Sequence, residues 1–231
     1  MDFNLNHKKV LVTGSTKGIG LEIAKKFLEN SSKVVINSNN SANLKKIKNK
    51  FKNKNSYFYK ADLTKDQEIK KLIAYSYKTM KGLDILVCNY GDGRKIKNNG
   101  EENYLDWINS LKVNLLSTTS CVYHSVKFLK KSSYPSILCI SSICGISASA
   151  APLDYSSSKS AINLFVKNQS KNLARYNIRI NSISPGNIYS KDGRWPSKFI
   201  KDKKLKSQII KNIPLRRFGT TEEIANAALF L

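Results

Sequence analysis

The stretch Val10-Leu11-Val12-Thr13-Gly14-Ser15-Thr16-Lys17-Gly18-Ile19-Gly20 decides the fold of this chain. Its apolar start suits a buried strand, and the glycine-rich turn that follows leads directly into sequence with a helical pattern. A helix that begins at such a turn presents free backbone N–H groups, and glycines let a pyrophosphate approach them without Cβ clashes. The spacing is G-x-x-x-G-x-G, not the common G-x-G-x-x-G. We therefore predict a dinucleotide-phosphate site, with a tight turn that binds nothing as the alternative.

Short apolar runs alternate with longer amphipathic stretches along the 231 residues. This alternation is typical of βαβ units with right-handed crossovers, which place helices on both faces of a parallel sheet. We predict an α/β fold, a single Rossmann-like, doubly wound parallel sheet in one domain over residues 1–231. The predicted strands are Lys8–Val12, Lys33–Ile36, Tyr57–Lys60, Leu83–Cys88, Ser136–Ile140 and Arg179–Ser184. The predicted helices are Gly18–Leu28, Ala42–Lys52, Lys65–Met80, Asn103–Lys130 and Asp154–Arg175.

The composition excludes several classes of protein. The formal net charge is +24, but 34 of the 40 basic residues are Lys, only six are Arg, and Asn is frequent. Joint Lys and Asn enrichment is typical of an AT-rich genome, whereas phosphate and base recognition usually employs Arg, so we expect no dedicated nucleic-acid binding. No apolar run is long enough for a membrane span or a secretion signal, so we expect no membrane association and a cytoplasmic location. The four cysteines form no C-x-x-C pair and the two histidines are far apart, which argues against a metal site.

The end of the second predicted strand indicates which dinucleotide binds. A site that prefers NAD places a carboxylate there for the ribose 2′-OH, and that carboxylate would repel a 2′-phosphate. Here the residues are Asn37, Ser38 and Asn39, with no acid among them. Lys17 in the glycine turn would also neutralise a 2′-phosphate, although Lys is common throughout this chain. We therefore predict that NADP(H) is favoured over NAD(H).

Three further residues suggest acid–base chemistry. Tyr155 and Lys159 are four residues apart on a predicted helix and therefore share one face. A phenol with a pKa near ~10 is a competent proton donor, and a cation one turn away favours its phenolate form. Ser142 lies 13 residues earlier at the carboxyl end of a strand, where its hydroxyl would bond the same substrate oxygen. Taken alone, the Tyr and Lys pair also fits an ordinary surface contact.

Together with the glycine turn, these residues resemble the short-chain dehydrogenase/reductase family over essentially the whole chain. The resemblance implies an NADP(H)-dependent oxidoreductase that interconverts a carbonyl and a secondary alcohol by hydride transfer, on a 3-oxoacyl-carrier-protein-like or sugar-type substrate. It implies a homodimer or homotetramer. It also implies that Asn114, Ser142, Tyr155 and Lys159 are the catalytic residues, with Asn114 anchoring a relay water. Tyr155 and Lys159 would in addition contact the cofactor. The other cofactor contacts it implies are Gly14, Ser15, Thr16, Lys17, Gly18, Ile19, Gly20, Ser38, Asp62, Leu63, Asn89, Gly91, Pro185, Gly186, Ile188 and Ser190.

The alternative to an enzyme is a catalytically silent dinucleotide-binding sensor or scaffold, which would have no reason to keep all four catalytic residues. The chain departs from the family pattern at Tyr90, where a small residue usually flanks the cofactor ribose, and at Ser190, where the family has Thr. It also stops before the family's final strand, so we expect that edge strand to be missing. The substrate segment is expected at about 187–212, and within it Asn187–Lys206 is expected to form a loop with a short helix. There Arg194 and Trp195 would hold a polar group, or Trp195 would simply anchor the loop.

Overall fold

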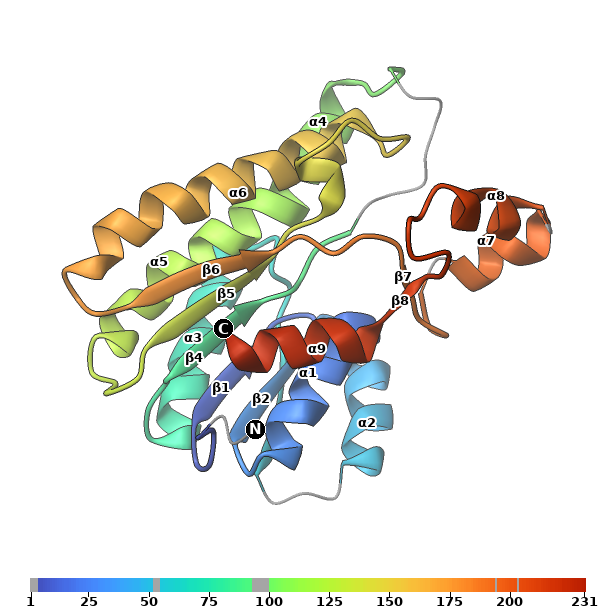
Figure 1. Cartoon of the computed structure of the whole chain (residues 1–231). Helices are drawn as coiled ribbons and strands as arrows, with labels where there is room; N and C mark the ends of the chain where they lie inside the picture. The colour runs from blue at the N-terminus through green and yellow to red at the C-terminus, as the bar shows by residue number, and fades with distance from the viewer. Residues whose placement is uncertain (1–3, 52–54, 93–99, 194, 203) are drawn as a thin grey trace.

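Six parallel strands form the central sheet of the computed structural model, which describes residues 4–51, 55–92, 100–193, 195–202 and 204–231. The strand order is β3-β2-β1-β4-β5-β6 (Figure 1). The direction of winding reverses between β1 and β4, and open α/β sheets bind ligands at the carboxyl ends of such strands. The strands are β1 (Lys9–Val12), β2 (Lys33–Ser38), β3 (Ser56–Lys60), β4 (Ile85–Cys88), β5 (Ser136–Ile140) and β6 (Arg179–Ile183).

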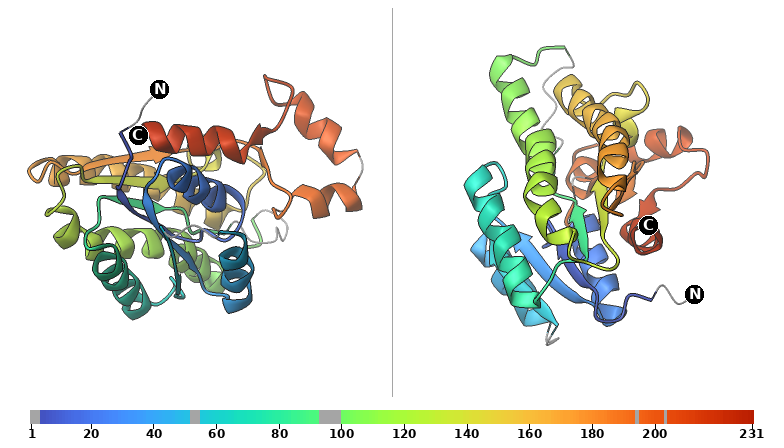
Figure 2. Two further views of the ribbon diagram at one scale, coloured as in Figure 1. Left: turned by 90° about the horizontal axis from the view of Figure 1, so that it is seen from below. Right: turned by 90° about the vertical axis from the view of Figure 1, so that its left-hand side faces the viewer.

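Helices cover both faces of this sheet (Figure 2), which confirms the predicted Rossmann-like α/β fold. One face carries α1 (Gly18–Glu29), α2 (Ser41–Lys50) and α9 (Thr221–Phe230). The other face carries α3 (Asp66–Met80), α5 (Ser117–Leu129) and α6 (Leu153–Ala174). Over the described residues β6 is the outer strand on its side of the sheet. None of the described helices combines the length and the apolar character that crossing a bilayer requires.

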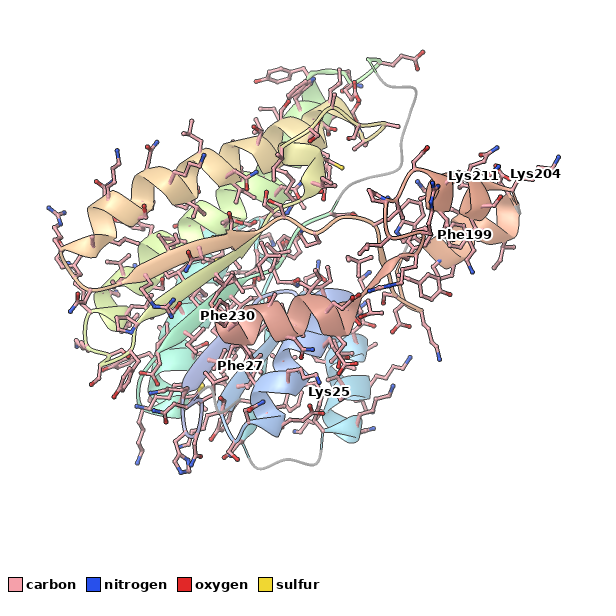
Figure 3. The ribbon with its side chains drawn as sticks, viewed as in Figure 1. Lys25, Phe27, Phe199, Lys204, Lys211 and Phe230 are labelled. Atoms are coloured by element: carbon pink, nitrogen blue, oxygen red, sulfur yellow. The ribbon has the colours of Figure 1, made fainter. Side chains whose placement is uncertain are left out.

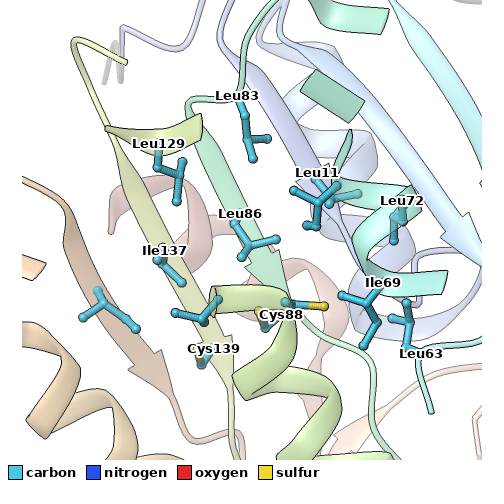
Figure 4. Packing of buried hydrophobic residues seen from close by; sticks show 14 of the residues in the cluster. Leu11, Leu63, Ile69, Leu72, Leu83, Leu86, Cys88, Leu129, Ile137 and Cys139 are labelled. Atoms are coloured by element: carbon cyan, nitrogen blue, oxygen red, sulfur yellow. The ribbon is translucent and has the colours of Figure 1, made fainter. Parts of the chain in front are cut away.

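The strands are apolar on both sides because both faces of the sheet are buried. In β1, Leu11 packs into the cluster under α3 and α5, whereas Val10 and Val12 pack into the cluster under α1 and α9. Figure 4 shows the first cluster, where Leu86 and Ile137 of neighbouring strands meet side chains of the covering helices. Full burial of such a side chain stabilises a fold by about 1.5–3 kcal/mol relative to exposure. These two clusters hold the strand ends, and with them the site, in fixed positions.

Three of the four cysteines belong to the first cluster. Cys88, Cys121 and Cys139 are buried free thiols, with Cys88 and Cys139 opposite each other on β4 and β5. Hydrogen bonding with the other two thiols, together with burial, raises the pKa of the Cys88 thiol. Within the described residues no group of His, Cys, Asp or Glu side chains has an arrangement that would hold a metal ion.

The helical stretch predicted over Asn103–Lys130 is not one uniform helix. It starts with α4 (Tyr104–Ser110), which Asn103 and Asp106 cap reciprocally, and widens into the π-helical turn η1 (Leu111–Leu116) before α5. In a π turn the backbone N–H bonds five residues back, and such turns occur often at functional sites. Asn114 lies within this turn.

Residues 187–220, here called the lobe, project from the body beyond the carboxyl end of β6 (Figures 1 and 3). The lobe contains β7 (Ile188–Tyr189), α7 (Trp195–Lys201), α8 (Leu205–Lys211) and β8 (Gly219–Thr220), and β7 pairs with β8 in parallel. The segment Asn187–Lys206, predicted as a loop with a short helix, contains the short helix α7; the pairing of β7 with β8 and the second helix α8 were not predicted. The ring of Trp195 lies 5.7 Å from that of Phe199 and 5.3 Å from that of Phe218, so an aromatic cluster forms a small core. Trp195 anchors the lobe in this way, while Arg194 lies outside the described residues.

Candidate active site

The glycine turn between β1 and α1 has the backbone shape that its sequence requires. Gly14 and Gly18 have φ values of +58° and +56°, in the left-handed region that other residues rarely adopt. A Cβ on Gly20 would collide with the Asn89 amide and lie 2.7 Å from the Gly14 carbonyl oxygen. Gly20 therefore lets α1 pack closely under the turn. Around Gly18, by contrast, the nearest atom to such a Cβ would be Ser190 Oγ at 3.9 Å, which leaves space above the turn.

The N-terminus of α1 fits an anionic ligand. Lys17 at the N-cap makes no side-chain capping bond, and the first turn contains no acidic residue. The first N–H groups of a helix lack intrahelical partners, and the helix dipole makes this end positive. Ser15 is buried and holds the turn from below, since its Oγ donates to Val12 O at 2.6 Å and accepts from Asn37 N at 3.0 Å. Thr16 and Ile19, the remaining predicted contacts, are only partly buried on the turn. The space above Gly18 and the uncapped helix end together fit a dinucleotide pyrophosphate.

Thr13 joins the ends of β1 and β4, a role that the sequence interpretation missed. Its Oγ1 accepts from the N–H groups of Asn89 and Tyr90 at 2.9 and 3.1 Å. In return the Asn89 amide nitrogen donates to the carbonyl oxygens of Thr13 and Gly14, each at 3.0 Å. Tyr90 packs directly against Gly14 and partly against the core cluster below it. The bulky Tyr90 is thus accommodated by the missing side chain of Gly14.

The end of β2 contains no carboxylate, as its sequence indicates. Asn37 is buried and structural: its Oδ1 accepts from Gly14 N at 3.2 Å, and its amide nitrogen donates to two carbonyl oxygens of the β3 edge. Ser38 is buried and its Oγ accepts from Asn40 N at 3.2 Å. Beyond it, Asn39 and Asp62 line an open cleft of about 440 Å³.

Asp62 and Leu63 follow β3 at this cleft. The Oδ1 atom of Asp62 accepts from the Thr64 N–H at 3.0 Å and from the Thr64 hydroxyl at 2.8 Å. The side chain of Leu63 is buried in the core cluster. Of these two predicted contacts, Asp62 forms part of the cleft wall, whereas the Leu63 side chain is directed into the core.

Lys159 is the most unusual side chain of the site. It is only 4% exposed, its Nζ donates to Ile140 O at 2.9 Å, and it lies 5.8 Å from the centre of the Tyr155 ring. Burial lowers the pKa of Lys159 to about 8. A Cβ on Gly91 would lie 3.1 Å from Lys159 Nζ and 2.8 Å from Asn114 Oδ1. The structure therefore brings Tyr155, Lys159, Gly91 and Asn114 together at the carboxyl ends of β4 and β5.

Asn114 acts as a clamp within this group. Its Oδ1 accepts from Asp92 N at 3.1 Å, and its Nδ2 donates to the carbonyl oxygens of Asp92 and Ser110 at the same distance. The amide is completely buried, and these bonds fix the segment after β4 against η1. The Asn114 side chain thus holds these backbone segments in place. The backbone carbonyl oxygen of Asn114 accepts a hydrogen bond from the Thr118 hydroxyl at 2.9 Å.

The turn after β5, which contains Ser142, is fastened to α6. The 3₁₀ turn η2 (Ile143–Gly145) follows Ser142, whose Oγ accepts from Cys144 N at 3.2 Å. A Cβ on Gly145 would lie 2.6 Å from backbone atoms of Lys159 and Ser160, and Asn163 Nδ2 donates to Gly145 O at 3.3 Å. Gly145 thereby fixes Ser142 relative to Lys159. Sequence reasoning missed this glycine, whose one signal is its place three residues after Ser142.

The segment after β6 returns to the glycine turn. Pro185 O accepts from Ile143 N at 3.0 Å, which ties the segment to the Ser142 turn, and Gly186 has no atom within 4 Å of a built Cβ. Ile188 begins the lobe in β7, and the Ser190 hydroxyl then lies beside Gly18. The predicted site residues from the two halves of the chain are thus brought to one edge of the sheet.

A doubly wound sheet with a glycine turn at its switch point, and a buried Lys beside a Tyr at the same edge, belongs to NAD(P)-dependent oxidoreductases that act on CH–OH and C=O groups. A family model described as enoyl-(acyl carrier protein) reductase matches residues 14–231. A 3-oxoacyl-(acyl-carrier-protein) reductase of Aquifex aeolicus is 35% identical over 234 residues, which covers 100% of this chain and 92% of that protein. The chain belongs to the short-chain dehydrogenase/reductase family, as its motifs predicted.

Solved structures agree with this assignment. The structure described as ElxO with NADP bound matches with a TM-score of 0.90 and 30% identity, covering 97% of this chain and 91% of that one. A 7α-hydroxysteroid dehydrogenase complexed with NADH and 7-oxo glycochenodeoxycholic acid matches with a TM-score of 0.90 and 27% identity, covering 100% and 89%. The fold thus accommodates either nicotinamide dinucleotide and chemically distant substrates.

Proposed function

We propose that this protein is an NADP(H)-dependent reductase that converts the keto group of a 3-oxoacyl thioester into a secondary alcohol. The observation that carries the proposal is the buried Lys159 next to Tyr155, at the edge where the glycine turn fits a dinucleotide. The similarity to a 3-oxoacyl-(acyl-carrier-protein) reductase supports the substrate class. When bound, NADPH supplies the hydride.

The chain's own residues then manage the proton and the developing negative charge. The Tyr155 hydroxyl donates its proton to the carbonyl oxygen as the carbonyl carbon gains hydride, and the Ser142 hydroxyl donates a hydrogen bond to the same oxygen. Lys159, held by Ile140 O, places a positive charge beside the phenol and favours its loss of the proton. Asn114 positions the backbone at the place where a relay water restores the proton to Tyr155.

We also propose that this site binds NADP(H) in preference to NAD(H). Its support is the absence of a carboxylate at Asn37, Ser38 and Asn39, and the exposed Lys17 at the N-cap of α1. A carboxylate at the end of β2 would repel the 2′-phosphate, and none is there. The remaining predicted contacts, from Asp62 at the cleft beside β2 and β3 to Ser190 beside Gly18, complete the proposed cofactor site.

Two further proposals concern the whole molecule. We expect a homodimer or homotetramer, because large apolar side chains are exposed along η1, α5 and α6 beside a groove of about 1060 Å³. Among them Leu116, Tyr123 and Leu164 are 52%, 75% and 61% exposed. The cytoplasmic location stays a prediction from the sequence. A catalytically silent sensor or scaffold is the alternative. The buried Lys159 beside Tyr155 argues against it, because a protein that only binds needs no cation that favours the phenolate form of Tyr155.

The test is to follow the oxidation of NADPH and of NADH by the purified chain with acetoacetyl-CoA as the thioester probe, and with ketosugars and steroid ketones as alternatives. We expect turnover of the thioester, faster with NADPH at equal low cofactor concentration. Turnover of sugars alone would move the substrate class to sugars. Tight dinucleotide binding without turnover of any carbonyl would instead support the sensor or scaffold.

A further inference from the structure

The cleft beside β2 and β3 lies where the ribose end of a bound dinucleotide is proposed to sit. Its volume is about 440 Å³, and its walls are formed by Asn39, Lys60, Asp62, Lys65 and Glu68. In the parallel pairing of β2 with β3, Ser38 stands opposite Lys60. Neighbouring strands are ~4.8 Å apart, so Lys60 starts one strand away from the residues expected at the ribose 2′ position. Its long, exposed side chain lines the cleft.

The two lysines of this cleft differ in their partners. Lys65 Nζ lies 3.3 Å from Glu68 Oε1 and 4.0 Å from Asp62 Oδ2, so it pairs with both acidic groups of the cleft. Glu68 Oε2 also accepts from Asp62 N at 2.7 Å, and Asp62 Oδ1 accepts two bonds from Thr64. Lys60 forms no ion pair with any residue that the structure describes. Lys60 is thus the lysine of this cleft that has no ion-pair partner among the described residues, while both carboxylates are already engaged.

The Lys60 ammonium group has no ion-pair partner among the described residues and is carried by a flexible side chain. Such a group is suited to a phosphate, because it binds as a point charge and needs no fixed geometry. Adenine and the ribose hydroxyls offer no negative charge, whereas a 2′-phosphate does. The phosphate source in question is therefore the cofactor's own 2′-phosphate. Since Lys60 is exposed, its attraction to that phosphate is expected to weaken with added salt.

We infer that Lys60 binds the 2′-phosphate of NADP(H) from the β3 side of the cleft and determines much of the preference over NAD(H). The sequence motifs did not point to this residue, since it lies in the third strand and not in the glycine turn or at the end of the second. The inference rests on the proposed function, because it requires a dinucleotide to lie with its adenosine end in this cleft.

The experiment measures binding of two ligands that lack the nicotinamide, adenosine 2′,5′-bisphosphate and adenosine 5′-monophosphate, by calorimetry on the full chain. Lys60→Gln removes the charge, and Lys60→Arg keeps it. Lys50→Gln is the matched control, since it removes one exposed charge at the far end of α2, ~14 Å along the helix from Ser41. We expect Lys60→Gln to weaken the bisphosphate by about five- to tenfold at low salt. Binding of the monophosphate should change less than about twofold in every variant.

The outcomes separate the inference from the proposal beneath it. If the parent chain binds the bisphosphate no more tightly than the monophosphate, the proposed NADP(H) preference is wrong, and so is the proposed role of Lys60 in binding the 2′-phosphate. If the parent shows the preference and Lys60→Gln keeps it, the preference stands and the role of Lys60 is overturned. Equal weakening of the binding of both ligands also overturns the role of Lys60, because it indicates damage to the cleft. An unchanged thermal melt of Lys60→Gln and retained bisphosphate binding by Lys60→Arg support the role of Lys60.

Discussion

Single residues of the site are held by bonds that leave their chemistry little freedom. Lys159 donates to Ile140 O, Asn114 is bonded on all sides of its amide, and Ser142 sits on a turn fastened to α6. Tyr155 is partly exposed at the same edge. These bonds fix the groups that surround the Tyr155 hydroxyl. Removal of this hydroxyl therefore tests the proposed acid–base chemistry most directly.

Replacing Tyr155 with Phe removes the proton donor and keeps the ring that packs beside Lys159. We expect kcat for carbonyl reduction to fall by about 10²–10⁴, the usual contribution of a general acid. The affinity for NADPH should stay within about twofold, as measured by fluorescence titration. Tyr123→Phe, on the exposed side of α5, is the control and should keep parental kinetics. A kcat for Tyr155→Phe within about tenfold of the parent would contradict the assignment.

Replacing Gly145 with Ala tests the contact between η2 and α6. The new Cβ would lie 2.6 Å from backbone atoms of Lys159 and Ser160, so the turn must move and carry Ser142 with it. We expect the free energy of unfolding to fall by about 1–3 kcal/mol, as in other overpacked sites, and kcat to fall by at least about tenfold. Thermal melts and steady-state kinetics measure both. Ser147→Ala, exposed two residues further on, is the control. Parental stability and kcat in the Gly145 variant would show that the turn has room.

Among the elements, α9 depends on a small network at its start. Glu223 accepts from Thr220 N at 2.8 Å and from two nitrogens of Arg217 at 3.0 and 2.6 Å, and Thr220 Oγ1 accepts from Glu223 N at 3.1 Å. The Arg217 contact, assisted by the Thr220 N–H, lowers the pKa of Glu223 to about 2. Because β8 ends where α9 begins, this network also fixes the C-terminal end of the lobe at Gly219–Thr220.

The Glu223→Gln variant should therefore show a pH-dependent loss of stability. A carboxyl whose folded pKa is about 2, below its ordinary 4.5, stabilises the fold fully above 4.5 and loses this effect as pH falls toward 2. We expect a lower Tm than the parent at neutral pH, and a difference that shrinks as pH decreases through that window. Melting curves across pH measure it, with Glu29→Gln on α1, which makes no capping bond, as the control. A difference that stays constant with pH would contradict the linkage.

Elements with strong local signals could be predicted from the sequence, and those made by distant contacts could not. The six strands and the turn at Gly14 are set by local apolar runs and glycines. The π turn η1 was missed because the apolar pattern through Asn114 continues without a break. The pairing of β7 with β8 was missed because Ile188 and Gly219 are brought together only by the folded lobe. In the same way, the roles of Thr13 and Gly145 depend on partners far along the chain.

At the scale of the whole molecule, the positive charge is spread over the outside. Lys204 lies at the outer end of the lobe, Lys211 lies at the other end of α8, and Phe199 lies within the lobe (Figure 3). Most lysines are exposed, whereas Lys159 is buried. The net charge of +24 therefore describes the solvent-facing surface, and the apolar exceptions along α5 and α6 stand out against it.

These exposed apolar side chains predict that two copies of the chain associate through α5 and α6. We expect Leu164→Glu, which places a charge on that face of α6, to shift the protein toward monomers in sedimentation velocity. Ile200→Glu, an exposed residue of α7 in the lobe, is the matched control and should leave the distribution unchanged. A parent chain that sediments as a monomer at every concentration would contradict the proposed homodimer or homotetramer.

The pairing of β7 with β8 makes the lobe a closed cassette. The chain leaves the body at Ile188 and re-enters it at Gly219, and these residues are register partners, with Gly219 N donating to Asn187 O at 2.9 Å. A segment whose two ends are clamped together at its base can be exchanged or lengthened at small entropic cost to the rest of the chain. The six-stranded sheet, the glycine turn and Lys159 contribute no residue to the cassette between those clamps. A new substrate range can therefore evolve by exchange of the insert beyond Ser190, while the sheet, the glycine turn, Lys159 and the proposed cofactor contacts at Ile188 and Ser190 are kept.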